Sequence, residues 1–172
     1  MVHDYDAHSH SPAQPAHSPT QHDTHTHAQS DDQLLALLDL DAEVLHGYWT
    51  AALDWVRQAA EGDGWHRLLD LGAGTGTGAI GLAQRFDQAD VLAVDSSTES
   101  LHRLGEKAGQ LGLAGRIQPV EADFDAGWPE LGTLDLIWAS MSLHHMADPE
   151  RTLRQARAAS RPGGLIAVAE FP

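Results

Sequence analysis

The sequence has no cysteine among its 172 residues, which excludes disulfides, thiolate metal ligands and a cysteine nucleophile. It also lacks any run of about 18 apolar residues, the length that a membrane-spanning helix needs. The N-terminus is polar and acidic rather than basic and then apolar, so no secretory signal is expected. These absences predict a cytoplasmic protein that does not span a membrane.

Positive charge is scarce as well. There are 10 lysine and arginine residues against 25 aspartate and glutamate residues, and the formal net charge is -15. The first basic residue along the chain is Arg57. Proteins that bind nucleic acids need a basic surface to neutralise phosphates, and so do proteins that bind anionic membranes. The composition therefore argues against a nucleic-acid partner and against a membrane partner.

The first part of the chain divides into two regions by composition. Residues 1–30 hold seven of the 12 histidines and almost no aliphatic side chain, which predicts a disordered His-rich tail. Its histidines could bind Zn²⁺ or Ni²⁺ weakly, but incidental histidines in a solvated tail are favoured and no metal site is predicted. Apolar residues at spacings of three and four predict a helical region over 31–61, with a break near Gly47. Tyr48 and Trp49 could form a lid in this region, although ordinary helix core is favoured.

Over residues 62–172 short apolar segments alternate with amphipathic ones. This alternation predicts right-handed crossovers and a doubly wound, mainly parallel, Rossmann-like α/β sheet behind the N-terminal helices. Such sheets bind ligands at the carboxyl ends of their strands. The sequence RPGG predicts a tight turn into the last strand at Gly164. Strands are expected within 66–72, 90–97, 116–124, 133–140 and 164–171, and helices within 77–86, 98–113 and 148–160.

A glycine-rich segment follows the first predicted strand and reads Asp70-Leu-Gly72-Ala73-Gly74-Thr-Gly76. Its spacing is not the G-x-G-x-x-G of dinucleotide sites. The Asp70 carboxylate can accept a hydrogen bond from a ligand ammonium, whereas it would disfavour a pyrophosphate. The segment therefore favours a zwitterionic ligand, and a purely steric role of the glycines is the competing interpretation.

Acidic residues also end the next two predicted strands. Asp95 can accept hydrogen bonds from both hydroxyls of a ribose, or it can be a helix N-cap or a loop acid, with Ser96 and Ser97 equally able to cap. Asp123 can accept the amino group of an adenine, while Phe124 offers its backbone N–H and its ring to the purine. The three acids at the ends of three consecutive strands together predict a nucleoside site.

Five segments in order carry a family resemblance: LLDLGAGTGTG, VLAVD, VEADF, LDLIWASMSLHHM and RPGGLIAVAE. They resemble the class I methyltransferases that depend on S-adenosylmethionine (SAM), in the small-molecule branch that includes the ubiquinone/menaquinone-type enzymes. The resemblance runs from Arg67 to Phe171. It implies SAM as cofactor and a small molecule as methyl acceptor. The implied cofactor-binding residues are Asp70, Gly72, Ala73, Gly74, Gly76, Asp95, Ser96, Asp123, Phe124 and Ser140.

Two histidines follow the fourth predicted strand, where the acceptor approaches in this family. His144 and His145 could act as a base or position the acceptor, with a structural role as the alternative for either. The Asn/Asp-Pro-Pro-aromatic motif of many amine and amide methylators is absent, which favours methylation of oxygen or carbon over a nucleic-acid base.

The sequence departs from the family in ending directly after the fifth predicted strand. Members continue with strands six and seven, which this sequence lacks. We therefore expect either a chain truncated after the fifth strand or an apolar edge at that strand that a second copy or a partner covers. One alternative function is a non-catalytic SAM-binding fragment or module that needs a partner or its missing C-terminus. A less favoured alternative is a NAD-dependent dehydrogenase, against which the glycine spacing and the lack of a Tyr-x-x-x-Lys pair argue.

Overall fold

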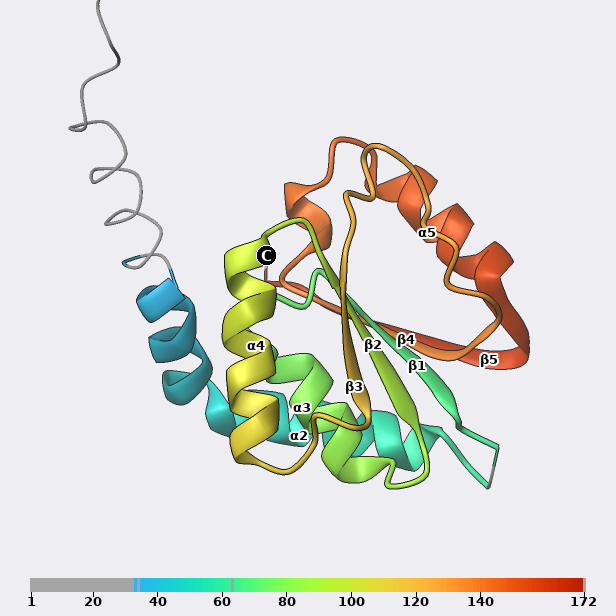
Figure 1. Cartoon of the computed structure of the whole chain (residues 1–172). Coiled ribbons are helices and arrows are strands. Elements are labelled where there is room, and N and C mark those ends of the chain that lie inside the picture. The colour runs from blue at the N-terminus through green and yellow to red at the C-terminus, as the bar shows by residue number, and fades with distance from the viewer. Residues whose placement is uncertain (1–32, 34, 63, 172) are drawn as a thin grey trace, which may run out of the picture.

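A computed structural model describes residue 33 and residues 35–62 and 64–171, so the tail predicted over 1–30 lies outside it (Figure 1). Five parallel strands form one sheet in the order β3-β2-β1-β4-β5. The predicted doubly wound α/β fold is confirmed. The strands are β1 (Arg67–Leu71), β2 (Asp90–Asp95), β3 (Ile117–Glu121), β4 (Leu134–Ser140) and β5 (Ser160–Ala169).

Helices cover both faces of this sheet, and each face has its own apolar core. Alternate residues of one strand enter different cores, since Leu68 packs with α2, α3 and α4 whereas its neighbour Leu69 packs with α5. Both residues are fully buried, which explains why the central strands β1, β2 and β4 are mainly apolar rather than alternating. The helices are α2 (His46–Ala59), α3 (Thr77–Arg85), α4 (Thr98–Gln110), η1 (Leu143–His145) and α5 (Pro149–Ala159).

Side-chain caps fix where two of the helices begin. The Ser97 hydroxyl accepts a hydrogen bond of 3.1 Å from the Ser100 backbone N–H at the start of α4. Asp148 accepts one of 2.8 Å from the Arg151 N–H, and Pro149 follows it in the first turn of α5. Both caps satisfy backbone donors that a helix otherwise leaves unpaired. They place the loops that end β2 and β4.

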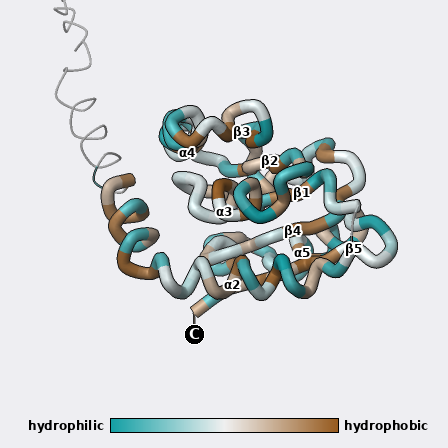
Figure 2. Tube along the Cα trace, turned by 90° about the horizontal axis from the view of Figure 1, so that it is seen from below, coloured by the Kyte–Doolittle hydropathy of each residue, from teal (hydrophilic) through white to brown (hydrophobic). Residues whose placement is uncertain are grey.

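The N-terminal helical region breaks two residues before the predicted position. A helical segment, residues 35–44, ends in a turn at Leu45, and α2 begins at His46 rather than after Gly47. The two helices run in different directions, and the first carries both hydrophobic and hydrophilic residues (Figures 1 and 2).

The start predicted for the last strand at Gly164 is wrong. β5 already begins at Ser160, and RPGG forms an irregularity within the strand, where the register against β4 shifts between Leu134 and Leu136. Gly163 takes up this irregularity with a φ of 77°. Within the described residues β5 is an edge strand that pairs with β4 alone, and no strand follows it.

No helix in the described part of the chain is long and apolar enough to cross a membrane. The same residues contain no cluster of three or more His, Asp or Glu side chains that could hold a metal ion. The predicted His-rich tail lies outside both findings.

Candidate active site

A cavity of about 880 Å³ opens at the carboxyl ends of the strands, beside β1, where the chain order of the sheet reverses between β2 and β4. Ligands of doubly wound folds bind at this switch point. The cavity brings together all of the predicted site residues except Gly76. Those residues are Asp70, Gly72, Ala73, Gly74, Asp95, Ser96, Asp123, Phe124, Ser140, His144 and His145.

Two glycines of the loop after β1 are needed for close packing. Gly72 has a φ of 72°, and a Cβ atom there would lie 2.4 Å from the Cβ atom of Ser142. Gly76 has a φ of 96°, and its Cβ atom would lie 2.6 Å from Leu104 Cγ in α4. Gly76 therefore shapes the loop from behind and does not line the cavity, unlike the cofactor contact that the resemblance implied.

Asp70 belongs to β1, and its side chain is buried against the first turn of α3, next to Trp138 of the neighbouring strand β4. The two residues are register partners between β1 and β4, and each is only 2% exposed. Asp70 Oδ2 and Trp138 Nε1 are buried without a hydrogen-bond partner among the described residues. Buried polar atoms are rarely left so, and at a cavity wall such atoms are typical of a site that a ligand or a water completes.

Burial also changes the acidity of Asp70. Desolvation raises the pKa of its carboxyl to about 7, with a smaller upward contribution from the charge of Asp95 and an opposing one from the Ala79 backbone N–H. A cationic ligand group next to Asp70 would favour the ionised form. The site is therefore suited to an ammonium.

Replacing Gly78 by alanine is expected to damage this part of the cavity. Its Cβ atom would lie 2.6 Å from Asp70 Oδ2 and 2.7 Å from Trp138 Nε1, so one of the two buried side chains must move. We expect a lower melting temperature and ligand affinity reduced at least tenfold, measured by thermal unfolding and calorimetry. Gly105→Ala in α4 is the matched control, because its Cβ atom meets nothing within 4 Å and helix propensity favours alanine by about 1 kcal/mol. Equal behaviour of the two variants would contradict the close packing.

Asp95 holds the loop in shape as well as facing the cavity. Its Oδ2 accepts a hydrogen bond of 2.8 Å from the Gly74 N–H, and its Oδ1 accepts one of 2.9 Å from the Ser97 N–H. Each carboxylate oxygen has a second lone pair, so both can still accept a ligand hydroxyl. Ser97 rather than Ser96 is the helix cap, which leaves Ser96 exposed at the cavity.

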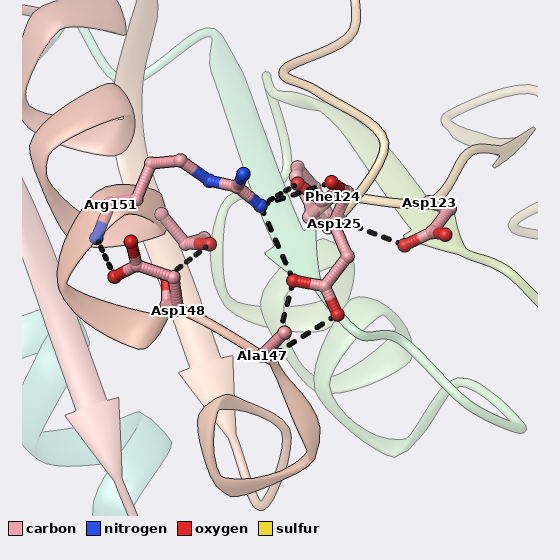
Figure 3. A network of polar contacts seen from close by, with 7 residues as sticks. Asp123, Phe124, Asp125, Ala147, Asp148 and Arg151 are labelled. Carbon is pink, nitrogen blue, oxygen red and sulfur yellow. Dashed lines mark hydrogen bonds and ion pairs between the residues drawn. The ribbon is translucent and has the colours of Figure 1, made fainter.

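The loop after β3 is fixed by the network in Figure 3. Asp123 Oδ1 accepts a hydrogen bond of 2.8 Å from the Asp125 N–H, and Asp125 in turn accepts bonds from the Ala147 N–H. The Arg151 guanidinium donates to the Asp125 carbonyl at 3.0 Å and to the Phe124 carbonyl at 3.3 Å. The Phe124 ring packs against Trp128 in the core, with ring centroids 5.1 Å apart. The network holds Asp123 at the cavity while anchoring Phe124.

The two histidines are in different situations. His144 Nδ1 lies 2.6 Å from Glu170 Oε2, whereas no hydrogen bond of the His145 ring is found among the described residues. Glu170 also accepts bonds from the Ser142 and Leu143 N–H groups, at 3.0 and 2.9 Å. Burial acts to raise the pKa of Glu170, but these hydrogen bonds outweigh it and hold that pKa below its usual range. An ionised Glu170 therefore faces His144.

Aromatic side chains meet beside the cavity. Trp49 and Phe171 both line it, with ring centroids 5.9 Å apart, and Tyr48 lies 5.2 Å from Phe171. Trp49 is only 9% exposed and belongs to the core as well as to the cavity wall. The favoured interpretation of Trp49 as helix core agrees with this burial, and the lid stays a prediction.

The sequence did not single out several side chains of the site. Glu170, Trp138 and Ser142 lie in strands or loops whose neighbours are set by the order of the strands, and no local spacing announces them. Met141 gives no sequence signal either, although among the described non-glycine residues it alone has a positive φ, 51°. Such strain gathers at functional sites.

Fold and cavity together define an α/β protein with a nucleoside-sized site at the switch point of a parallel sheet. Comparisons with known proteins agree. Residues 68–164 match the family model described as a methyltransferase domain. The chain belongs to this family, and the resemblance to class I SAM-dependent methyltransferases is confirmed. SAM is the cofactor that this membership assigns.

Two curated relatives have named activities. The 27-O-demethylrifamycin SV methyltransferase of Amycolatopsis mediterranei (strain S699) is 32% identical over 141 residues, which are 73% of this chain and 50% of the relative. The ubiquinone/menaquinone biosynthesis C-methyltransferase of Pseudoalteromonas translucida (strain TAC 125) is 30% identical over 122 residues, 68% of this chain and 48% of that protein. The chain spans about half the length of these relatives.

Two solved structures are similar at TM-scores of 0.61 each. One is coclaurine N-methyltransferase bound to N-methylheliamine and SAH (S-adenosylhomocysteine), 25% identical, with 70% of this chain and 35% of that chain covered. The other is the [4+2]-cyclase SpnF, which is 27% identical, with 69% of this chain and 43% of that chain covered. One of the two is described as a cyclase, so the fold alone does not determine the reaction.

Proposed function

We propose that this chain binds SAM in the cavity and transfers its methyl group to the oxygen or carbon of a small molecule. The charge of the cavity wall is the observation that carries the proposal. Among the described residues that line it there is no lysine or arginine, but there are six acids: Asp41, Asp70, Asp95, Glu99, Asp123 and Asp125. Such a wall attracts a cofactor with an ammonium and a sulfonium, and it disfavours the pyrophosphate of a nicotinamide dinucleotide.

The residues present fit this cofactor. Asp70 would hold the ammonium of the methionine portion, Asp95 the ribose hydroxyls and Asp123 the adenine amino group. The buried atoms without partners, Asp70 Oδ2 and Trp138 Nε1, support a ligand or a bridging water at the methionine end. When bound, SAM supplies an electrophilic methyl group on its sulfonium. The chain itself contributes alignment of donor and acceptor, worth up to about 7–11 kcal/mol in favourable cases.

His144 is the proposed base for an acceptor that must lose a proton. The ionised Glu170 accepts a hydrogen bond from Nδ1–H, which leaves Nε2 as the ring nitrogen with a free lone pair. The contact with Glu170 therefore fixes one tautomer of His144, in which Nε2 can accept the proton. His145, which lacks such a partner among the described residues, is assigned to positioning the acceptor.

Glu170→Gln is expected to slow methyl transfer about a hundredfold or more while leaving SAH affinity unchanged. The amide can still accept from the Ser142 and Leu143 N–H groups, but it can donate to Nδ1 and so favour the wrong tautomer. Ring ¹⁵N shifts in NMR report the tautomer directly. His102→Gln is the control with a small expected effect, because His102 is exposed and does not line the cavity. Wild-type turnover and an unchanged tautomer in Glu170→Gln would refute the assignment.

Transfer of a labelled methyl group tests the proposed activity. Incubation of the chain with methyl-labelled SAM and a cell extract is expected to place the label in small molecules rather than in nucleic acid. SAH binding without any transfer would favour the alternative, a non-catalytic SAM-binding module. Cytoplasmic location and the three-part division at residues 30 and 61 stay predictions.

We also propose that a second copy of the chain, or a partner, covers the exposed edge of β5. Among the described residues β5 pairs with β4 alone, and an uncovered apolar edge strand promotes aggregation. Light scattering distinguishes a dimer from a monomer.

A further inference from the structure

The helical segment 35–44 forms one wall of the cavity. Leu35 is buried, whereas Leu37, Leu40 and Val44 are more than half exposed, so the segment has an inner and an outer side. A turn at Leu45 separates it from α2. Its residues that line the cavity are Leu35, Leu38, Asp41 and Ala42.

One side chain of this segment, Asp39, makes three polar contacts with two other elements. Its Oδ1 accepts a hydrogen bond of 2.9 Å from Thr75 Oγ1 in the glycine-rich loop. Its Oδ2 accepts one of 2.6 Å from Arg103 Nε in α4, and Lys107 Nζ also donates to Asp39. Lys107 completes the set by donating to the Thr75 carbonyl at 3.1 Å.

These contacts join the segment to the loop that the cofactor must meet. Thr75 is only 4% exposed, lies between Gly74 and Gly76, and itself lines the cavity. Arg103 and Lys107 are four residues apart and therefore share one face of α4. Burial acts to raise the pKa of Asp39, but hydrogen bonds from Lys107, Thr75 and Arg103 outweigh it and lower that pKa. The carboxylate is therefore charged at neutral pH.

We propose that Asp39 is a positioning residue that locks the segment 35–44 onto the glycine-rich loop and so controls how fast the cofactor leaves. The inference rests on the proposed function, because it takes SAM as the occupant of the cavity. With Asp39 bound to Thr75, the segment and the loop enclose the ligand together. When the contacts break, the segment is free to swing about Leu45 and open this side of the cavity. Release then requires the rupture of one compact polar cluster.

Stopped-flow measurement of SAH binding to the full chain tests the proposal, with tryptophan fluorescence from Trp49 and Trp138 at the cavity wall as the signal. Asp39→Asn keeps the size of the side chain but removes its charge, and we expect SAH to dissociate about tenfold faster. Added salt should accelerate dissociation from the wild type more than from the variant, because the three charged side chains are 24–40% exposed. Thr75→Val should act in the same direction, and the double variant should add little to Asp39→Asn.

Asp54→Asn is the matched control, since it breaks the 2.7 Å ion pair with Arg85 outside the cavity and should leave dissociation unchanged. Hydrogen exchange over residues 35–44 should become faster in Asp39→Asn and stay protected by SAH in the wild type. A lower melting temperature with unchanged dissociation in Asp39→Asn and Thr75→Val would overturn the proposal, because the cluster would then be merely structural. Absence of SAH binding by the wild type would overturn the proposed function and this inference with it.

Discussion

Replacing Asp95 by alanine is expected to weaken SAH binding at least a hundredfold. The carboxylate would hold two ribose hydroxyls, and hydrogen bonds to a charged group are worth about 1.5–3 kcal/mol each. Two such bonds correspond to a factor of a hundred or more in affinity. The substitution also leaves the Gly74 and Ser97 N–H groups without their acceptor, which loosens the loop.

Calorimetry with two companion variants separates these effects. Asp95→Asn keeps one neutral oxygen and should give an intermediate affinity. Asp87→Ala removes an exposed acid that does not line the cavity and should bind as the wild type does. Wild-type affinity in Asp95→Ala would remove the ribose assignment.

Asp70→Asn is expected to raise stability above neutral pH and to weaken cofactor binding at the same time. The pKa of Asp70 is about 7 in the folded protein, whereas in the unfolded chain it is near 3.8. The folded state therefore binds more protons between these values, and the free energy of unfolding falls as pH rises through that window. The cost of burying the charge at pH 8 is on the order of 4 kcal/mol, which the uncharged amide avoids.

Thermal unfolding at pH 5 and pH 8 measures the stability effect, and the gain in Asp70→Asn should be larger at pH 8. Lowered pKa values of Asp39, Asp135 and Glu170 do not interfere, because those groups stay ionised throughout this window. A variant that is no more stable than the wild type at pH 8 would mean that Asp70 is not strained by its burial.

The same carboxyl predicts a pH dependence of binding. If only the ionised form of Asp70 accepts the ammonium, SAH affinity of the wild type should fall about tenfold from pH 8 to pH 6, as a group with a pKa near 7 requires. The Asp70→Asn variant should bind SAH more weakly than the wild type at pH 8, and its affinity should change little with pH. A flat profile in the wild type would place the ammonium elsewhere.

The acids of the proposed cofactor site could be found from the sequence because each lies at or near the carboxyl end of a predicted strand. In a parallel sheet the carboxyl ends lie along one edge, so Asp70, Asp95 and Asp123 had to come close once the strands were identified. The family motifs identified the cofactor in the same way. Only Gly76 departs from that set, because the spacing of glycines does not reveal which one faces Leu104 rather than the cavity.

The contacts between distant elements could not be found in this way. Glu170 meets His144 across 26 positions, and Asp39 meets Lys107 across 68. The periodicity of a segment predicts which of its faces is apolar. It does not predict which charged side chains of two distant elements contact each other. The segment RPGG was predicted as a turn, but it lies within β5. The register of β5 on β4 decides this, and the local sequence does not reveal that register.

Calorimetric titration of the full chain with SAH and, separately, with NADH tests the central claim most directly. The acidic cavity, which no lysine or arginine lines among the described residues, predicts that SAH binds with one molecule per chain and that NADH does not bind. Binding of NADH together with failure to bind SAH would contradict the assignment of this cavity to SAM.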